Sequence, residues 1–129
     1  MNASPAPKIA IVIEPNHAVA AVVETVLRES DYQVIVTLSH RSAMIEAQAF
    51  PVIHLLAACA PTADDEQQGA YLATVRDSQR KKMAVVLMLA ENAREDLAIP
   101  ELSQRLPKPF GREQFIEALC LAEWKALEL

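Results

Sequence analysis

The stretch KIAIVIEPN, residues Lys8 to Asn16, predicts a strand that leads into a helix. Its residues 9–13 are isoleucine, alanine and valine, a short apolar run that is typical of a strand covered on both faces. Pro15 interrupts the run, and the side chain of Asn16 can cap a helix that follows. From His17 to Glu29 apolar residues recur at helical spacing, which predicts a helix with one face against a core.

Units of a strand followed by a helix recur along the rest of the chain. Further strands are expected over residues 33–38, 52–58, 83–90 and 102–106, and further helices over residues 39–50, 66–80, 92–99 and 111–127. Parallel strands joined in this way need right-handed crossovers, so we predict an α/β protein whose five-stranded parallel sheet has helices on both faces. In such sheets function sits at the carboxyl ends of the strands, which directs attention to Glu14, Ala57, Ala90 and Lys108.

Length and composition predict a single globular domain. The chain has 129 residues, of which 52% are hydrophobic and 22% are charged. We expect a disordered leader over residues 1–7 and the folded domain over residues 8–122. Residues 123–129 are expected to form the end of the last helix or the start of a linker.

The charge and the apolar pattern exclude several classes of function. Twelve basic against seventeen acidic residues give a net charge of −5, which argues against nucleic-acid binding because phosphate contacts need lysine and arginine. The first residues do not resemble a signal peptide, and no apolar run is long enough to cross a membrane. We therefore expect a soluble, cytoplasmic protein in which Cys59 and Cys120 are two buried thiols.

A second stretch, LPKPF at residues 106–110, leads into the last predicted helix. It resembles the K-P-F signature of two-component response-regulator receiver domains, the CheY-like family. KIAIVIEPN and PVIHLLAACAP (residues 51–61) are similar to the first and third strands of that family, so the resemblance covers Lys8 to Ala122. It implies a flavodoxin-like (βα)5 three-layer sandwich, with Lys108 directed into the phosphorylation site and a cis peptide bond before Pro109.

The resemblance also indicates what the chain lacks. Receiver domains accept a phosphoryl group from a histidine kinase on an aspartate, beside a Mg²⁺ ion held by that aspartate and two acidic residues. A hydroxyl residue and the lysine then contact the phosphoryl oxygens. In this chain the acidic pair falls on Ile13 and Glu14, the acceptor on Ala57, the hydroxyl residue on Ala90 and the switch aromatic on Arg105. Of the family's site residues, Glu14 and Lys108 are retained.

A methyl group cannot attack phosphorus, and one carboxylate makes a poor Mg²⁺ site. The sequence therefore predicts a degenerate receiver, or pseudo-receiver, that is not an enzyme and uses no cofactor. It would act in two-component or phosphorelay signalling as a phosphorylation-independent protein–protein interaction module. Its partner would be a histidine kinase, an output domain or a second copy of the chain, with no nucleic acid and no membrane. Two alternatives stay open: phosphorylation on Asp64 or Asp65, and binding of a small ligand by a flavodoxin-like domain.

Ordinary structural roles are the competing interpretation for the charged and histidine side chains. Glu14 and Lys108 are expected to neutralise each other as an ion pair rather than to hold an anion or a metal. His54 is interpreted as a core or edge histidine. His17 and His40 each open a predicted helix, and we expect both to be solvated.

The remaining candidates are a cysteine and the last helix. Cys59 lies at the rim of the expected site, but no flanking cation in the sequence favours its thiolate. Phe115 and Leu119 fit a core stripe, whereas Trp124 falls off that stripe. Trp124 and Leu127 are therefore candidates for an interaction surface, the alternative being that Trp124 folds back over the end of the domain.

Overall fold

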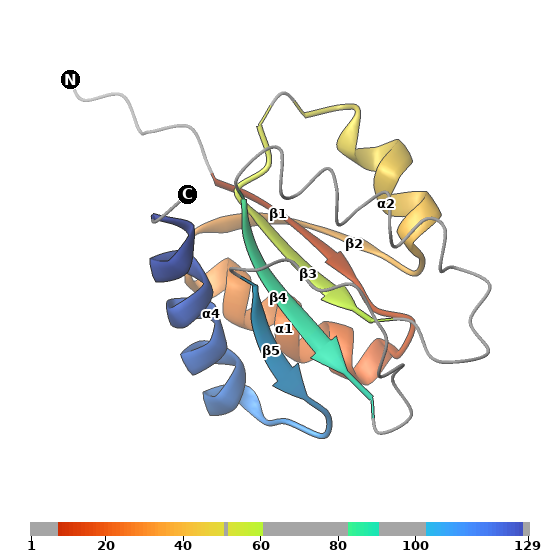
Figure 1. The fold of residues 1–129 in the computed structure, drawn as a ribbon. Helices are drawn as coiled ribbons and strands as arrows, with labels where there is room; N and C mark the ends of the chain where they lie inside the picture. Colours follow the sequence, from red (N-terminus) through yellow and green to blue (C-terminus); the bar gives the residue numbers. More distant parts are fainter. Residues whose placement is uncertain (1–7, 51, 61–82, 91–102, 128–129) are drawn as a thin grey trace.

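The computed structural model describes residues 8–50, 52–60, 83–90 and 103–127 of the chain. Their strands form one five-stranded parallel sheet in the order β2-β1-β3-β4-β5 (Figure 1). The elements are β1 (Lys8–Ile13), α1 (His17–Glu29), β2 (Tyr32–Thr37), α2 (His40–Ala47), β3 (Leu55–Cys59), β4 (Ala84–Leu89), β5 (Gln104–Pro107) and α4 (Arg112–Ala126). The predicted parallel α/β fold is confirmed.

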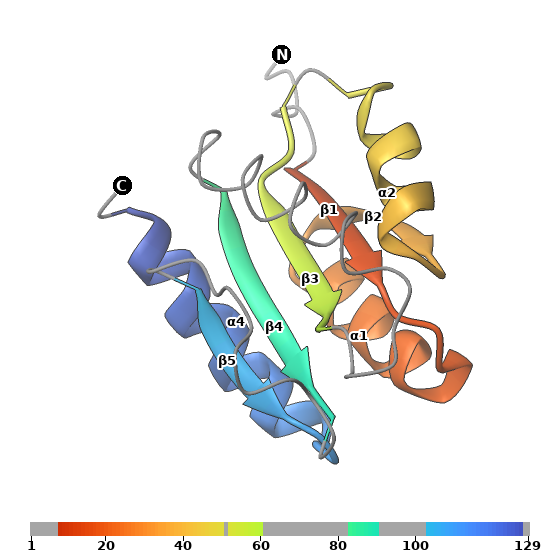
Figure 2. The ribbon, with the colours of Figure 1, turned by 45° about the vertical axis from the view of Figure 1, so that its right-hand side comes forward.

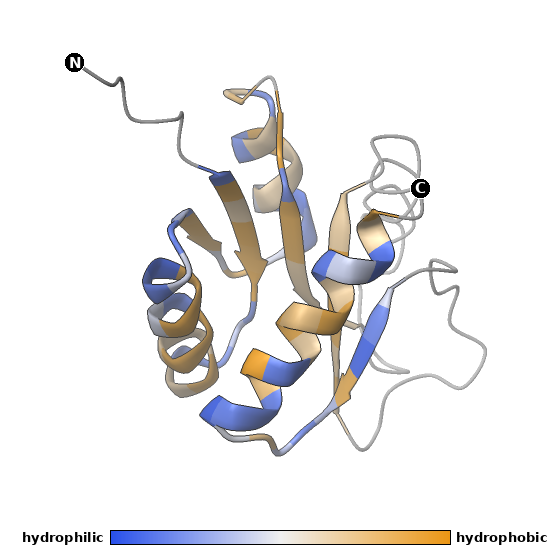
Figure 3. Cartoon of the chain, turned by 90° about the vertical axis from the view of Figure 1, so that its left-hand side faces the viewer, coloured by the Kyte–Doolittle hydropathy of each residue, from blue (hydrophilic) through white to orange (hydrophobic). Residues whose placement is uncertain are grey.

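The described helices lie on both faces of the sheet. Helices α1 and α4 cover one face, and α2 covers the other (Figure 2). The residues of β1 alternate between the two layers: Ala10 and Val12 pack toward α1 and α4, and Ile9, Ile11 and Ile13 pack toward α2. Because both of its faces are covered, β1 is apolar over nearly its whole length, as are β3 and β4 (Figure 3).

Local signals in the sequence fix where the helices begin. The side chain of Asn16 accepts hydrogen bonds from the backbone N–H groups of Ala18 and Val19, at 3.0 and 3.1 Å, and so caps α1. Ser39 caps α2 in the same way through the backbone N–H of Ser42, at 3.1 Å. At the start of α4 the Gln114 side chain reaches back 2.7 Å to the backbone N–H of Gly111.

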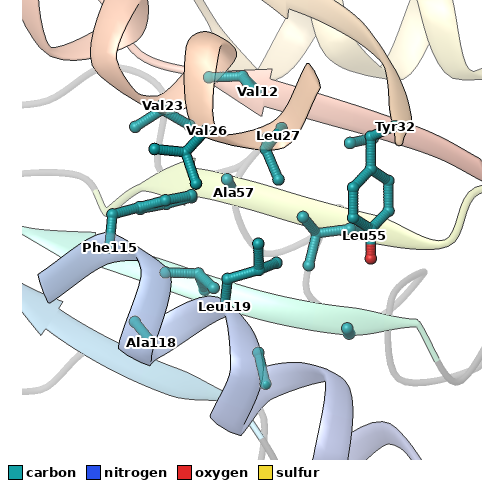
Figure 4. Packing of buried hydrophobic residues seen from close by; sticks show 14 of the residues in the cluster. Val12, Val23, Val26, Leu27, Tyr32, Leu55, Ala57, Phe115, Ala118 and Leu119 are labelled. Carbon is teal, nitrogen blue, oxygen red and sulfur yellow. The ribbon is translucent and has the colours of Figure 1, made fainter. Parts of the chain in front are cut away.

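Helix α4 buries one stripe along its length. Its fully or nearly fully buried residues recur at positions i, i+3, i+4 and i+7, and they are Phe115, Ala118, Leu119 and Ala122. This stripe meets the buried side of α1 over the centre of the sheet (Figure 4). The prediction that Phe115 and Leu119 face the core is confirmed.

Several predicted boundaries differ from the structure by a few residues. Strand β3 begins at Leu55 rather than Val52, whose side chain is exposed, and it continues to Cys59. Helix α2 ends at Ala47, earlier than the predicted Phe50. The predicted helices over residues 66–80 and 92–99 and the predicted leader over residues 1–7 lie outside the described residues. Across the described ranges, no helix has the length and hydropathy to span a bilayer.

A polar cluster joins the first two strands to the last helix. The Tyr32 hydroxyl, on β2, donates a 2.7 Å hydrogen bond to the Glu123 carboxylate on α4. The ammonium of Lys8 lies 3.7 Å from the same carboxylate and 4.5 Å from the centre of the Tyr32 ring. Three residues far apart in the sequence thus meet at the amino-terminal end of β1.

This cluster predicts a loss of stability at alkaline pH. Burial, the hydrogen bond to Glu123 and the charge of that carboxylate all disfavour the phenolate, so the pKa of Tyr32 is raised above its ordinary value of 10.0. A raised pKa in the folded state stabilises the protein below the unfolded pKa, and this contribution is lost as the pH rises further. We expect Tyr32→Phe to lose about 1 kcal/mol at neutral pH and to approach the wild-type stability above pH 10. Urea denaturation of the wild type and the variant at a series of pH values measures the two free energies of unfolding. A difference between them that stays constant from neutral to alkaline pH would contradict the prediction.

Candidate functional site

A buried carboxylate lies at the carboxyl end of β1. Glu14 directly follows β1, and its side chain has no exposed surface. Its backbone N–H donates to the Thr37 carbonyl at 3.0 Å, which holds it beside the end of β2. One carboxylate oxygen, Oε2, accepts from the backbone N–H of Asn16 at 3.0 Å. The other, Oε1, lies 2.6 Å from the ammonium nitrogen of Lys108.

Lys108 directly follows β5, and its side chain reaches this carboxylate across the ends of β4 and β3. Its backbone N–H donates to the carbonyl of Leu89 at 2.7 Å, and the Lys108–Pro109 peptide bond is cis. The Lys108 side chain is 19% exposed. Burial by itself lowers the pKa of Lys108, but the hydrogen bond to Glu14 and the nearby Cys59 and Glu14 groups outweigh it, so the pKa of Lys108 is raised. The expected ion pair is therefore present, and it keeps the ammonium charged.

Cys59 is the third member of this cluster. It ends β3, it is half-buried, and its Sγ accepts from the Lys108 ammonium at 3.5 Å. Its Sγ also lies 3.6 Å from the Ala60 carbonyl oxygen, to which the thiol donates. No cation flanks Cys59 in the sequence; the cation beside its sulfur comes from residue 108, which no local pattern in the sequence brings close.

A histidine anchors the backbone of the same residue. The Nε2 atom of His40 lies 2.9 Å from the Cys59 carbonyl oxygen. His40 is only 3% exposed, so the prediction that it is solvated is wrong. Its position at the start of α2 directs the ring across to the end of β3 instead of into solvent.

Ala57 lies in the core and not beside Glu14, Lys108 and Cys59. It is 0% exposed and packs among apolar side chains of α1 and α4, including Val23, Val26 and Phe115 (Figure 4). Since β3 continues to Cys59, the side chain two residues further along the same face is the one that reaches Lys108. Neither side chain on this face of the strand end carries a carboxylate.

The other positions implied by the family resemblance are scattered. Ile13 is buried in the layer under α2, and Arg105 is exposed on β5. Ala90 is half-buried, and with Val19, Val22, Lys108 and Phe110 it lines an open pocket of about 600 Å³ at the ends of the strands. The structure thus brings Glu14 and Lys108 together, and it leaves Ile13 and Arg105 apart from them.

The remaining histidine and cysteine candidates that the structure describes are His54, His17 and Cys120. His54 is exposed just ahead of the central strand β3, and its Nδ1 accepts from the backbone N–H of Ile9 at 3.0 Å, so it has a structural role there. His17 is exposed as expected. Cys120 is also exposed, which corrects the prediction of a buried thiol. Asp64 and Asp65, the alternative phosphoacceptors, lie outside the described residues.

The donor set does not fit the Mg²⁺ ion that the family resemblance implies. Both oxygens of Glu14 already have partners, in Lys108 and Asn16, and Ile13 and Ala57 offer no oxygen in their side chains. Mg²⁺ prefers several oxygen ligands in octahedral geometry. Within the ranges that the structure describes, no three His, Cys, Asp or Glu side chains converge as a metal site.

Sequence comparisons are silent on this chain, because no family model and no curated protein matches it. Solved structures do match. A CheY-like response regulator receiver domain protein from Methanospirillum hungatei is similar over 95% of this chain and 98% of its own, with a TM-score of 0.73 and 16% identity. The chain has the receiver fold.

Two further receiver-fold neighbours agree. The chemotaxis response regulator CheY4 of Vibrio cholerae aligns over 91% of this chain and 99% of its own, with a TM-score of 0.72 and 17% identity. A sensor protein from Polaromonas aligns over 92% of this chain and 98% of its own, with a TM-score of 0.70 and 18% identity. At identities this low the likeness establishes the receiver fold, while the function has to be argued from the site.

Proposed function

We propose that this chain is a receiver-fold signalling module that works through protein–protein contacts and without aspartyl phosphorylation. The proposal rests on what occupies the end of β3. Ala57 is a buried methyl group, and the neighbouring side chain that faces Lys108 is a thiol. Formation of an acyl phosphate requires a carboxylate nucleophile, which neither position supplies.

The Glu14–Lys108 pair supports the same proposal. In a working receiver, by the family resemblance, the lysine is available to an incoming phosphoryl group. Here the Lys108 ammonium contacts a fully buried carboxylate at 2.6 Å and a sulfur at 3.5 Å. Breaking a buried pair leaves an uncompensated charge, so the pair opposes the entry of Mg²⁺ and phosphate. In this proposal the Glu14–Lys108 pair has a structural role: each side chain neutralises the charge of the other at the strand ends.

An apolar stripe on α4 and on the residue that follows it is the surface that we assign to protein contacts. Leu121, Trp124 and Leu127 follow one another at a spacing of three residues, with exposed fractions of 37%, 64% and 82%. Exposed tryptophan and leucine on a helix are typical of the centre of a protein interface, where aromatic side chains contribute much of the binding energy. The partner in this proposal is another signalling protein or a second copy of the chain.

Incubation with acetyl phosphate and Mg²⁺ tests the phosphorylation part of the proposal. We expect the intact mass of the protein to stay unchanged, because the described strand ends offer no nucleophilic carboxylate other than the paired Glu14. Intact-mass spectrometry on samples that are kept cold, mildly acidified and measured promptly, because acyl phosphates hydrolyse readily in alkali, is the measurement.

Gain of one phosphoryl group would contradict the proposal, and a matched variant then identifies the acceptor. If the adduct disappears in the double variant Asp64→Asn/Asp65→Asn, the chain is a phosphorylatable receiver that uses a non-standard aspartate. If the adduct persists in that variant and disappears in Glu14→Gln, the ion pair opens to react, which also refutes the proposed role of Glu14.

A further inference from the structure

We infer that Cys59 is a site of oxidation by hydroperoxides, activated by the ammonium group of Lys108. The reaction rests on the contact between the Cys59 sulfur and the Lys108 nitrogen, and it would hold whether or not the chain signals in the way proposed above. It assigns a chemical role to a thiol at the position where the fold's strand ends converge.

The Cys59 sulfur is in direct contact with a cation. The thiolate, not the thiol, is the nucleophile of cysteine chemistry, and a lysine ammonium beside the sulfur favours it. Lys108 Nζ lies 3.5 Å from Cys59 Sγ, at the distance of a hydrogen bond to sulfur. The pKa of Lys108 is raised above its ordinary value and its side chain is partly exposed, so the sulfur faces a cation at neutral pH.

Neighbouring groups oppose or adjust the effect of the ammonium on the sulfur. The Glu14 carboxylate shares the ammonium and attenuates its pull on the sulfur. The Ala60 carbonyl oxygen accepts from the thiol at 3.6 Å, which favours the protonated form. His40 holds the Cys59 carbonyl at 2.9 Å and so fixes the backbone that carries the sulfur. The Lys108 ammonium is in direct contact with Sγ, so removal of the Glu14 charge should strengthen the pull of the ammonium on the sulfur.

Cys59 and Lys108 both have some exposed surface. Cys59 is half-buried, in contrast to the fully buried Ala57 two residues earlier. Lys108 is partly exposed and lines the open pocket at the ends of the strands. A small solute such as hydrogen peroxide can therefore approach the ammonium and the sulfur beside it.

The reaction balances with hydrogen peroxide as the oxidant. The Cys59 thiolate attacks one peroxide oxygen, an S–O bond forms as the O–O bond breaks, and the sulfur loses two electrons. The second oxygen leaves as hydroxide and takes a proton to become water, so that thiol and peroxide yield sulfenic acid and water. Ionisation of the sulfenic acid places a negative oxygen beside Lys108, where it competes with Glu14 for the ammonium.

The chain carries its own reference thiol for the experiment. Cys120 is exposed on α4, and the part of the chain that the structure describes places no cation in contact with its sulfur. The full-length protein is treated with hydrogen peroxide at neutral pH, the sulfenic acid is trapped with dimedone, and labelling of each cysteine is followed by peptide mass spectrometry. We expect Cys59 to be labelled roughly ten times faster than Cys120 although it is less exposed.

Two variants separate activation by Lys108 from simple exposure. The double variant Glu14→Gln/Lys108→Met removes both charges together, so it avoids an unpaired buried carboxylate. It should lower the rate at which Cys59 is labelled roughly tenfold and leave the labelling rate of Cys120 unchanged. Glu14→Gln alone leaves the ammonium without its carboxylate and should raise the rate at which Cys59 is labelled by roughly threefold. Circular dichroism confirms that each variant is folded. Equal rates for the two cysteines in the wild-type protein, or a Cys59 rate that does not respond to Lys108, would overturn the inference.

Discussion

Replacing Lys108 with methionine is expected to lower the free energy of unfolding by about 3–5 kcal/mol, because it leaves the Glu14 carboxylate buried without its cation. Glu14 has no exposed side-chain surface and lies 2.6 Å from the Lys108 ammonium. Its remaining hydrogen bond, from the backbone N–H of Asn16, cannot balance a full charge. Urea denaturation at neutral pH, followed by circular dichroism, measures the change.

The matched control changes both partners. In Glu14→Gln/Lys108→Met no charge is left behind, and the glutamine oxygen can still accept from the backbone N–H of Asn16. We expect this double variant to recover most of the stability that Lys108→Met loses, since a neutral pair avoids the burial of an unpaired charge. A loss below about 1 kcal/mol in Lys108→Met, or no recovery in the double variant, would show that the ion pair does not govern the stability of the strand ends.

Phe115→Ala is expected to lower the free energy of unfolding by a similar amount, about 3–5 kcal/mol. The Phe115 side chain is 0% exposed and lies where α1, α4 and the sheet meet, close to Ala57 (Figure 4). Its deletion removes apolar contacts from both helices and leaves a cavity that a parallel sheet cannot collapse to fill. Because a domain of this size is stable by only about 5–15 kcal/mol, thermal unfolding should occur at a clearly lower temperature.

Trp124→Ala is the control on the same helix. Trp124 is 64% exposed, so its removal should change the free energy of unfolding by less than about 0.5 kcal/mol. If the α4 stripe is a protein-contact surface, the same variant should weaken association, which light scattering over a range of protein concentrations measures for self-association. A stability loss equal to that of Phe115→Ala would mean that Trp124 packs onto the domain.

Much of the fold could be predicted because its determinants are local. The apolar run of β1, the caps at Asn16 and Ser39 and the buried stripe beginning at Phe115 are all readable within a few neighbouring residues. Local patterns fail at the ends of elements, where packing decides. β3 therefore starts later than its apolar run and extends further, to Cys59.

The site was harder to predict, because its contacts join residues far apart in the sequence. The lysine beside Cys59 is 49 positions away, and the carbonyl beside His40 is 19 positions away. The family resemblance placed Lys108 at the strand ends but gave no indication of which β3 side chain it would contact. The exposure of Cys120 was predictable in principle: it follows Leu119 by one position, which turns it away from the buried stripe of α4.

The contact of Lys8 and Tyr32 with Glu123 has a practical consequence for engineering. It places the first residue of β1 within 3.7 Å of a residue in the last turn of α4, at the end of the sheet opposite to Glu14 and Lys108. A reporter domain attached ahead of β1 or behind α4 would project from that end and leave the opposite end of the sheet, with the open pocket beside Lys108, uncovered. The same adjacency would let a short peptide bridge close the domain into a ring, so that new ends could be opened in a surface loop.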